Sequence, residues 1–338
     1  MQFDRVEELI SQFASKQILV IGDLMLDEFV WGRVSRISPE APVPVVEVIR
    51  ETSYPGGAAN VARNVREFAD TVHLCGLVGE DVHAERLRSI LGKCGIQLSA
   101  LQADGGYQTI VKTRIIARQQ QVVRVDREVV QALQPETQAR ALAAVKALLP
   151  RIDAVIFEDY GKGFLNQKFV DQVTEATRAA GKVITADPNP RNRIEWRGLT
   201  AVKPNRAEAF AVAGEAFQEP ASNPLDDEAL RRVGDKLLAR WEPETLLITL
   251  GEQGMMLFRP QTEPVHIHPQ PREVYDVSGA GDTAIALLTL GLASRATAEE
   301  AAEISNHASG VVVGKLGTAT LTPAELRASF HEALGREG

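Results

Sequence analysis

The chain has 338 residues, of which 44% are hydrophobic and 24% charged, and its formal net charge is −8. This size and composition are typical of a globular protein with one large α/β domain or two smaller ones. Nucleic acids and anionic membranes both favour a basic surface, so the acidic chain argues against either partner. The longest apolar stretch is shorter than the roughly 18 residues of a membrane span, and we expect a cytoplasmic protein.

Short apolar strands alternate with amphipathic helices along most of the chain. The runs that predict buried strands lie at 18–21, 154–157, 183–186 and 246–249. Helical periodicity is found at 57–69, 84–94, 137–149, 166–180 and 226–241. Continuously apolar strands separated by helices predict an α/β fold, with a doubly wound, mostly parallel sheet that helices cover on both faces.

Two segments, at about 28–50 and 107–127, are rich in Val, Ile and Thr and are not followed by a helix. Such strands suit a small second sheet outside the helix-covered layer. The two-residue period of a strand places Lys112, Arg114 and Arg118 on one face of the second segment. It places Arg124 and Asp126 on another. An ordinary solvated edge sheet is the alternative explanation of these charges.

The ends of the chain and its two cysteines carry little further information. The first residues lack the basic and apolar regions of a signal peptide, so we expect none. Cys75 and Cys94 are far apart and fit no pairing or metal pattern. We expect both to be buried thiols in a reducing compartment.

The strongest local signal is the turn Gly279-Ala280-Gly281-Asp282. It follows a strand-like run from Glu273 to Val277 and opens an apolar helix from Thr283 to Ala293. Two glycines allow a sharp turn, and the N–H groups and positive end of the helix form an anion site. A carboxylate would repel a bound phosphate, so Asp282 indicates a general base beside an anion hole, as phosphoryl transfer to an alcohol requires. A helix-capping aspartate is the alternative.

Other nucleotide and metal motifs fit less well. Gly279, Gly281 and Ala284 match the dinucleotide fingerprint, but too little chain follows to supply the remaining βαβ units. No Gly-Lys pair is followed by the Ser or Thr of a Walker loop, and no His-Glu-x-x-His motif is present. These observations exclude a dehydrogenase, a P-loop enzyme and a zinc protease of that type.

Polar residues recur where predicted strands end, which is where open α/β sheets bind ligands. Asp23 and Asp27 follow the first strand, and Asp23 is suited to hydrogen bonding with sugar hydroxyls. Gly56-Gly57 precedes a helix in which Asn60 can donate and accept, although helix capping explains these residues as well. Further clusters follow later strands at 158–163, 187–191, 203–208 and 251–254. Within them Asn205 and Glu208 are suited to holding hydrated Mg²⁺ beside phosphates.

These motifs, in this order, resemble the ribokinase-like sugar kinases over about residues 17–325. They are Gly22-Asp23, the run 56–60, the run 205–208, the run 249–254 and Asp-Val-Ser-Gly-Ala-Gly-Asp-Thr at 276–283. The resemblance implies a doubly wound domain with a β-sheet lid, and we expect a single domain over 1–338 whose lid strands are the two inserted segments. It also implies that Asp282 is the base and that Gly279, Ala280 and Gly281 form the anion hole.

The same resemblance implies the remaining roles. The sugar is held by Asp23, Gly56, Gly57 and Asn60, and we add the nearby Asp27. ATP and Mg²⁺ lie beside Asn205, Glu208, Thr249, Gly251 and Gly254, with Asn306 near the adenine. Asp276 and Ser278 match the loop that binds a monovalent cation, K⁺, in many members of the family.

Four motifs resemble those of a narrower group within this family, the D-glycero-β-D-manno-heptose 7-phosphate kinases. These are Trp31-Gly32, the run 36–45, Asp159-Tyr160-Gly161-Lys162-Gly163 and Gly314-Lys315-Leu316-Gly317-Thr318. The resemblance implies phosphorylation of the anomeric hydroxyl on the route to ADP-heptose for lipopolysaccharide. Such kinases are often fused to a nucleotidyltransferase with a His-x-Gly-His signature, which this sequence lacks, so we expect a kinase-only form.

A phosphorylated sugar gives the lid cations a role. The candidates for its phosphate are Lys112, Arg114, Arg118 and Arg124, with Arg36 and Lys162 also available. From the narrower motifs, Asp159 is a candidate for substrate binding and Lys315 for nucleotide binding. We expect lid closure to exclude water and a homodimer to form through the lid strands, because exposed sheet edges invite pairing. Two alternatives remain: a kinase of this fold for another sugar, sugar phosphate or nucleoside, and a non-catalytic sensor, which would be expected to have lost Asp282.

Overall fold

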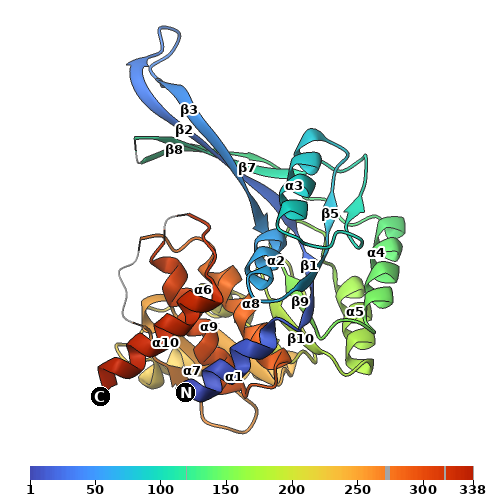
Figure 1. The fold of residues 1–338 in the computed structure, drawn as a ribbon, viewed down its shortest axis with the longest axis vertical. Coiled ribbons are helices and arrows are strands. Elements are labelled where there is room, and N and C mark those ends of the chain that lie inside the picture. The colour runs from blue at the N-terminus through green and yellow to red at the C-terminus, as the bar shows by residue number, and fades with distance from the viewer. Residues whose placement is uncertain (119, 271–274, 316, 338) are drawn as a thin grey trace.

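The computed structural model describes residues 1–118, 120–270, 275–315 and 317–337. Its main layer is an eight-stranded sheet in the order β14-β13-β12-β11-β10-β9-β1-β4 (Figure 1). The strands are β1 (Gln17–Gly22), β4 (Thr71–Cys75), β9 (Ala154–Glu158), β10 (Val183–Asp187), β11 (Ala201–Val202), β12 (Thr245–Thr249), β13 (Met255–Phe258) and β14 (Val265–Ile267). The six from β4 to β12 in this order are parallel, and β13 and β14 are antiparallel.

Helices cover both faces of this sheet because its strands are apolar on both sides. In β1, Ile18 and Val20 pack into one buried cluster, and the alternating Leu19 and Ile21 pack into the other. The first cluster includes residues of α1 (Phe3–Phe13), α2 (Ala58–Arg66), α3 (Val82–Lys93), α8 (Ala280–Ala293), α9 (Ala298–Val313) and α10 (Pro323–Glu337). The second includes residues of α4 (Pro135–Leu148), α5 (Gln167–Ala179), α6 (Arg206–Ala213) and α7 (Glu228–Trp241). The predicted doubly wound α/β architecture is confirmed.

A second sheet of four strands, in the order β3-β2-β7-β8, lies outside the helix-covered layers. Its strands are β2 (Leu24–Ile37), β3 (Pro44–Gly57), β7 (Ile110–Ala117) and β8 (Gln120–Arg127). The long β2–β3 hairpin projects well away from the body of the molecule (Figure 1). Because β2 starts two residues after β1 and β3 runs directly into α2, this sheet is tied to the carboxyl edge of the main sheet.

Two local predictions need correction. The expected strand from Glu273 to Val277 lies partly outside the described residues, and Tyr275–Val277, the described part, is not a strand. Helix α8 begins at Ala280 rather than Thr283, so the Gly-Ala-Gly-Asp turn includes its first helical turn. A minor pair, β5 (Leu77–Val78) and β6 (Gln102–Ala103), completes the strands of the described residues.

The remaining sequence expectations concern membranes and thiols. Within the described residues, no helix combines the length and apolar character needed to cross a bilayer. Cys75 is buried and free, as expected, whereas Cys94 is free but only partly buried because it ends α3 near the surface.

Candidate active site

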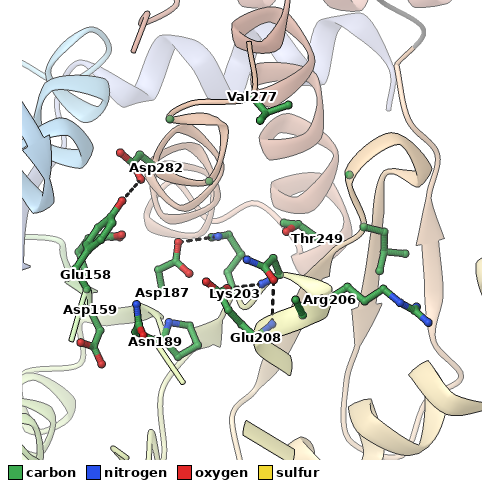
Figure 2. Close-up of a pocket in the computed structure, with 18 of the residues that line it drawn as sticks. Glu158, Asp159, Asp187, Asn189, Lys203, Arg206, Glu208, Thr249, Val277 and Asp282 are labelled. Atoms are coloured by element: carbon green, nitrogen blue, oxygen red, sulfur yellow. Dashed lines mark hydrogen bonds and ion pairs between the residues drawn. The ribbon is translucent and has the colours of Figure 1, made fainter. Parts of the chain in front are cut away.

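The carboxyl ends of the parallel strands and the N-terminus of α8 enclose a cavity of about 560 Å³ (Figure 2). Strand β9 leads into its wall at Glu158 and Asp159, and β10 ends at Asp187. Residues after β11 and β12 line the opposite wall. The cavity therefore occupies the position at which doubly wound sheets bind ligands. Its lining includes Glu158, Asp159, Tyr160, Asp187, Asn189, Lys203, Asn205, Glu208, Thr249, Gly251, Gly279, Gly281 and Asp282.

The N-terminus of α8 points its backbone amides at this cavity. Gly279 is the N-cap residue and has φ +81°, a left-handed conformation that strains residues with a side chain. No side chain of the described residues caps the helix at this end. Ala280 N donates to the carbonyl of Val277 at 3.3 Å, and the amides of Gly281 and Asp282 follow it at the positive end of a 14-residue helix. This geometry suits the anion hole that the sequence predicts.

Asp282 is buried in the first turn of α8 and is one of the residues that line the cavity. Asn60 Nδ2 donates to Oδ2 at 2.6 Å, and Tyr160 OH donates to Oδ1 at 2.9 Å. Burial raises the pKa of Asp282 above its ordinary value, and the Asn60 and Tyr160 hydrogen bonds and the charge of Lys203 partly oppose that rise. Each oxygen retains a lone pair, so the carboxylate can still accept a proton.

A buried ion pair lies beneath the anion hole. Lys203, which follows β11, is 2% exposed, and its Nζ contacts Asp187 Oδ2 at 2.7 Å (Figure 2). Burial alone would lower the pKa of Lys203, but Asp187, Glu208 and Glu158 surround it and raise that pKa, so the amine stays charged. The Nζ atom is 3.7 Å from the place where a Cβ on Gly281 would lie. A fixed positive charge therefore supports the first turn of α8.

Carboxylates are in excess around the cavity. The Glu158 side chain is buried with its Oε2 unpartnered, and burial together with Asp187 and Asp282 raises its pKa well above the usual value. Asp159, a predicted site residue, accepts from Gly161 N at 2.8 Å, and burial raises its pKa to about 7. Such a concentration of buried acids is stabilised by a bound cation.

Of the predicted nucleotide-binding residues near β11 and β12, all except Gly254 line the cavity. Asn205 and Glu208 form a capping box at the start of α6: Glu208 N donates to Asn205 Oδ1, and Asn205 N donates to Glu208 Oε2. One carboxylate oxygen of Glu208 is left for a ligand. Thr249 and Gly251 line the cavity beside them, whereas Gly254 packs against the backbone of β14 and is not part of the lining.

Two other predicted nucleotide residues have structural partners instead. Asn306, on α9, donates from Nδ2 to the carbonyl of His268 at 2.7 Å, so it fixes the segment after β14. Lys315 donates to the carbonyl of Thr320 and pairs with Glu325 at 2.6 Å, which anchors the start of α10. Neither residue lines the cavity. Leu316, from the same sequence motif as Lys315, lies outside the described residues.

The structure gives Asp23 a different role from the predicted sugar contact. Its carboxylate accepts three backbone hydrogen bonds, from Tyr160 N, Lys162 N and Phe164 N at 2.9–3.1 Å. Burial raises its pKa and these amides oppose the rise. Asp23 therefore fixes the loop after β9, and its carboxylate has little capacity left for a sugar hydroxyl.

Asp27, in contrast, lies beside the predicted glycine pair. A Cβ on Gly56 would come within 2.3 Å of Asp27 Oδ2, and Gly57, with φ +60°, closes β3 onto α2. Asn60 follows in the first turn of α2, and its Oδ1 is buried without a partner. Of these four predicted residues, Asn60 contacts Asp282, and none lines the cavity.

Four of the predicted phosphate-binding cations are paired with carboxylates. Arg114 contacts Asp27, Arg124 binds Asp126, and Lys112 and Lys162 converge on Glu128 at 3.0 and 2.8 Å. Lys112 also reaches Asp126 at 3.0 Å. Strand register places Lys112 opposite Asp126 and Arg114 opposite Arg124. The four side chains of these two strand pairs thus share one face, contrary to the two faces that were predicted.

Arg118 and Arg36 are not brought to the site of their own chain. β7 ends at Ala117, and Arg118 lies in the tight turn before β8 with φ +58°, which takes it off the strand face of Lys112 and Arg114. Arg36 is exposed and pairs with Val45 near the far end of the β2–β3 hairpin. The two-residue period failed for Arg118 because the pairing of β7 is irregular between Ile115 and Ile116 and the strand then ends.

The predicted cation loop is ordered by its own aspartate. Asp276 accepts from Ser278 N at 2.9 Å and from Gly317 N at 3.1 Å. Burial opposes the effect, but these hydrogen bonds lower the pKa of Asp276. The described residues contain no group of three His, Cys, Asp or Glu side chains placed to hold a metal ion.

The comparisons with known proteins agree with this geometry. Residues 15–325 match the model of the pfkB family of carbohydrate kinases. The chain belongs to that family. It is 41% identical over 323 residues to the "Bifunctional protein HldE" of Desulfatibacillum aliphaticivorans, and 39% identical over 327 residues to that of Vibrio atlanticus. These matches cover 96% of this chain but only 65% and 66% of the relatives' own lengths.

Solved structures of other carbohydrate kinases share the fold. Arabidopsis thaliana ribokinase, solved with ribose and ATP, superposes with a TM-score of 0.72 at 17% identity, covering 93% of this chain and 98% of its own. Escherichia coli phosphofructokinase-2, solved with potassium, gives 0.75 at 16% identity over 94% and 99%. This carbohydrate kinase is therefore ribokinase-like in fold.

Three residues that contribute to the kinase cavity were not selected from the sequence. Tyr160, Asp187 and Lys203 all lie in clusters that follow strands, and that position was the available signal. Tyr160 reaches Asp282 across 122 positions of the chain, and Lys203 reaches Asp187 from a different strand end. Sequence spacing cannot reveal such contacts.

Proposed function

We propose that this carbohydrate kinase transfers the γ-phosphoryl group of ATP to the anomeric hydroxyl of D-glycero-β-D-manno-heptose 7-phosphate. The product is the 1,7-bisphosphate, an intermediate on the route to ADP-heptose for lipopolysaccharide, and residues 1–338 act as a single domain with a lid. The observation that carries the proposal is Asp282: a carboxylate with free lone pairs, held by Asn60 and Tyr160 beside an uncapped helix N-terminus.

The reaction is a direct in-line transfer. The sugar oxygen forms a bond to the γ-phosphorus, the bond from that phosphorus to the β–γ bridging oxygen breaks, and ADP leaves with that oxygen. Asp282 accepts the hydroxyl proton, and the Gly281 amide together with the positive end of α8 stabilises charge on the transferred group. Lys203 adds a positive charge below that amide. Because the transition state is loose, most of the catalysis is positioning and charge stabilisation.

The chemistry of the cavity walls fits Mg²⁺ and a monovalent cation. Glu208 has one carboxylate oxygen outside its capping box, and it stands near further buried acids whose pKa values are raised. We propose that Asn205 and Glu208 hold Mg²⁺ through water, where it would neutralise phosphate charge. Asp276 and Ser278 are the proposed K⁺ residues, and a potassium complex is known for phosphofructokinase-2.

The acceptor is proposed from the sequence motif at 31–45 and from the relatives named HldE. Lys112, on β7 of the lid, and Lys162, in the loop after β9, converge on Glu128 and lower its pKa, although burial acts in the opposite direction. Two cations directed at one point form a site where a sugar phosphate can replace the carboxylate. Arg114, beside Asp27, is the third candidate for this contact.

The test is a panel of acceptors with ATP and Mg²⁺, with products identified by mass. Heptose 7-phosphate should be phosphorylated with the highest kcat/KM, ahead of fructose 6-phosphate, unphosphorylated sugars and nucleosides. Preference for another acceptor would overturn the substrate but not the kinase. Loss of turnover with every acceptor would favour a non-catalytic binding protein.

We also propose a homodimer through the lid strands. β8 is an edge strand exposed along its whole length, and Val122, Val123 and Val125 on it are 40–45% exposed. Exposed apolar edges favour pairing with a second chain. Light scattering after size-exclusion chromatography should give twice the chain mass of 36.8 kDa, and a Val123→Lys variant should shift it toward the single mass.

A further inference from the structure

The segment after β9 connects two parts of the site that are far apart in sequence. Its backbone is fixed by Asp23, which accepts from the amides of Tyr160, Lys162 and Phe164. Its one large side chain over the cavity, Tyr160, extends from this fixed backbone to Asp282, 122 residues further along the chain. The ring of Tyr160 also packs near Gly57, since its Cδ2 is 3.5 Å from the place of a Cβ there.

We propose that Tyr160 is a positioning residue for the base: its hydroxyl holds the Asp282 carboxylate in the orientation that faces the acceptor hydroxyl and keeps it ionised. The inference rests on the proposed role of Asp282. Asn60 donates to Oδ2 and Tyr160 to Oδ1, so the two donors together fix the carboxylate plane. A rotated carboxylate would lose at least one of these two hydrogen bonds.

The protonation state of Tyr160 makes it a donor. Burial raises the pKa of its phenol well above the ordinary value, and the neighbouring carboxylates of Asp282, Glu158 and Asp187 raise it further. A neutral phenol next to a carboxylate can only donate to it, and hydrogen bonds to a charged group are stronger than those between neutral groups. Loss of this bond should therefore raise the pKa of Asp282 by about one unit or more.

Other charges act on the same carboxylate and have to be kept constant in a test. Lys203 favours the ionised form of Asp282, whereas Asp27 disfavours it. Glu158 and Asp187, on β9 and β10, interact with Asp282 through their charges. Tyr160→Phe leaves all four in place and removes a single oxygen, so a change in titration reports the missing hydrogen bond.

The decisive measurement does not need turnover. Full-length protein is labelled with aspartate carrying ¹³C in the carboxyl group, and the Asp282 signal is assigned by its loss in Asp282→Asn. In Tyr160→Phe the titration midpoint of that signal should move to higher pH by about one unit. Tyr107→Phe removes another buried phenol, 8% exposed, that does not line the cavity and should leave the midpoint unchanged.

Kinetics supply the second readout. With the preferred acceptor, the acid limb of the kcat/KM profile should shift upward by the same amount in Tyr160→Phe, and kcat at neutral pH should fall about tenfold. KM for ATP should stay unchanged. An unshifted midpoint would overturn the inference even if kcat falls. A shifted midpoint in a protein without kinase activity would support the contact and overturn the proposed function instead.

Discussion

Replacing Asp282 with asparagine tests the proposed base with almost no change in volume. The variant keeps the shape of the side chain but cannot take up the hydroxyl proton, and one of its two ends must present an N–H group to a donor, Asn60 or Tyr160. A positioned base contributes on the order of 10²–10⁴-fold to a rate, equal to about 3–5 kcal/mol of barrier. We expect kcat to fall by that factor while KM for ATP changes little, because the nucleotide wall of the cavity is untouched.

The thermal stability of Asp282→Asn, unlike its kcat, should not fall. Burial raises the pKa of Asp282, so the folded protein holds a proton that the unfolded chain releases above its ordinary value of 3.8. The free energy of unfolding therefore falls as pH rises from 3.8 through the folded-state pKa. The neutral amide in Asp282→Asn removes that loss, and we expect Tm of the variant at neutral pH to be equal to or above that of the wild type.

Steady-state kinetics and thermal melting of Asp282→Asn together test whether Asp282 is the base. Asp235→Asn, an exposed change on α7, is the control and should alter neither quantity. Near-normal kcat in Asp282→Asn would exclude this residue as the base. A large fall in both kcat and Tm would mean that the carboxylate serves the fold rather than the reaction.

Three further outcomes follow from the same geometry. Lys203→Met should leave Asp187 buried and unpaired, which costs about 3–5 kcal/mol; urea unfolding measures this cost, and a loss below about 1 kcal/mol would contradict it. Arg114→Met should raise KM for the sugar phosphate several-fold without changing KM for ATP, and equal effects on both substrates would remove Arg114 from the phosphate site. Burial raises the pKa of Asp159 from 3.8 to about 7. The free energy of unfolding should therefore fall as the pH rises through this range. Urea unfolding at several pH values should show a smaller pH dependence in Asp159→Asn.

The sequence by itself determined the fold class, because continuous apolar strands between amphipathic helices can be buried only between two helical layers. It also predicted the proposed anion hole and base, because Gly279, Gly281 and Asp282 are close neighbours in the chain and a helix start brings its own amides together. The family's motifs could be recognised for the same reason, because each spans only a few residues at the end of one strand.

Only the tertiary structure decided which of those side chains have free atoms. Asp23 was expected to bind sugar but accepts three backbone amides, and Lys315 was expected near nucleotide but anchors α10. Conversely, Tyr160 and Lys203 reach the site through contacts between distant segments. A strand pattern predicts where a residue lies along the chain. Whether its side-chain atoms are free for a ligand depends on hydrogen-bond partners that only tertiary packing brings within about 3 Å.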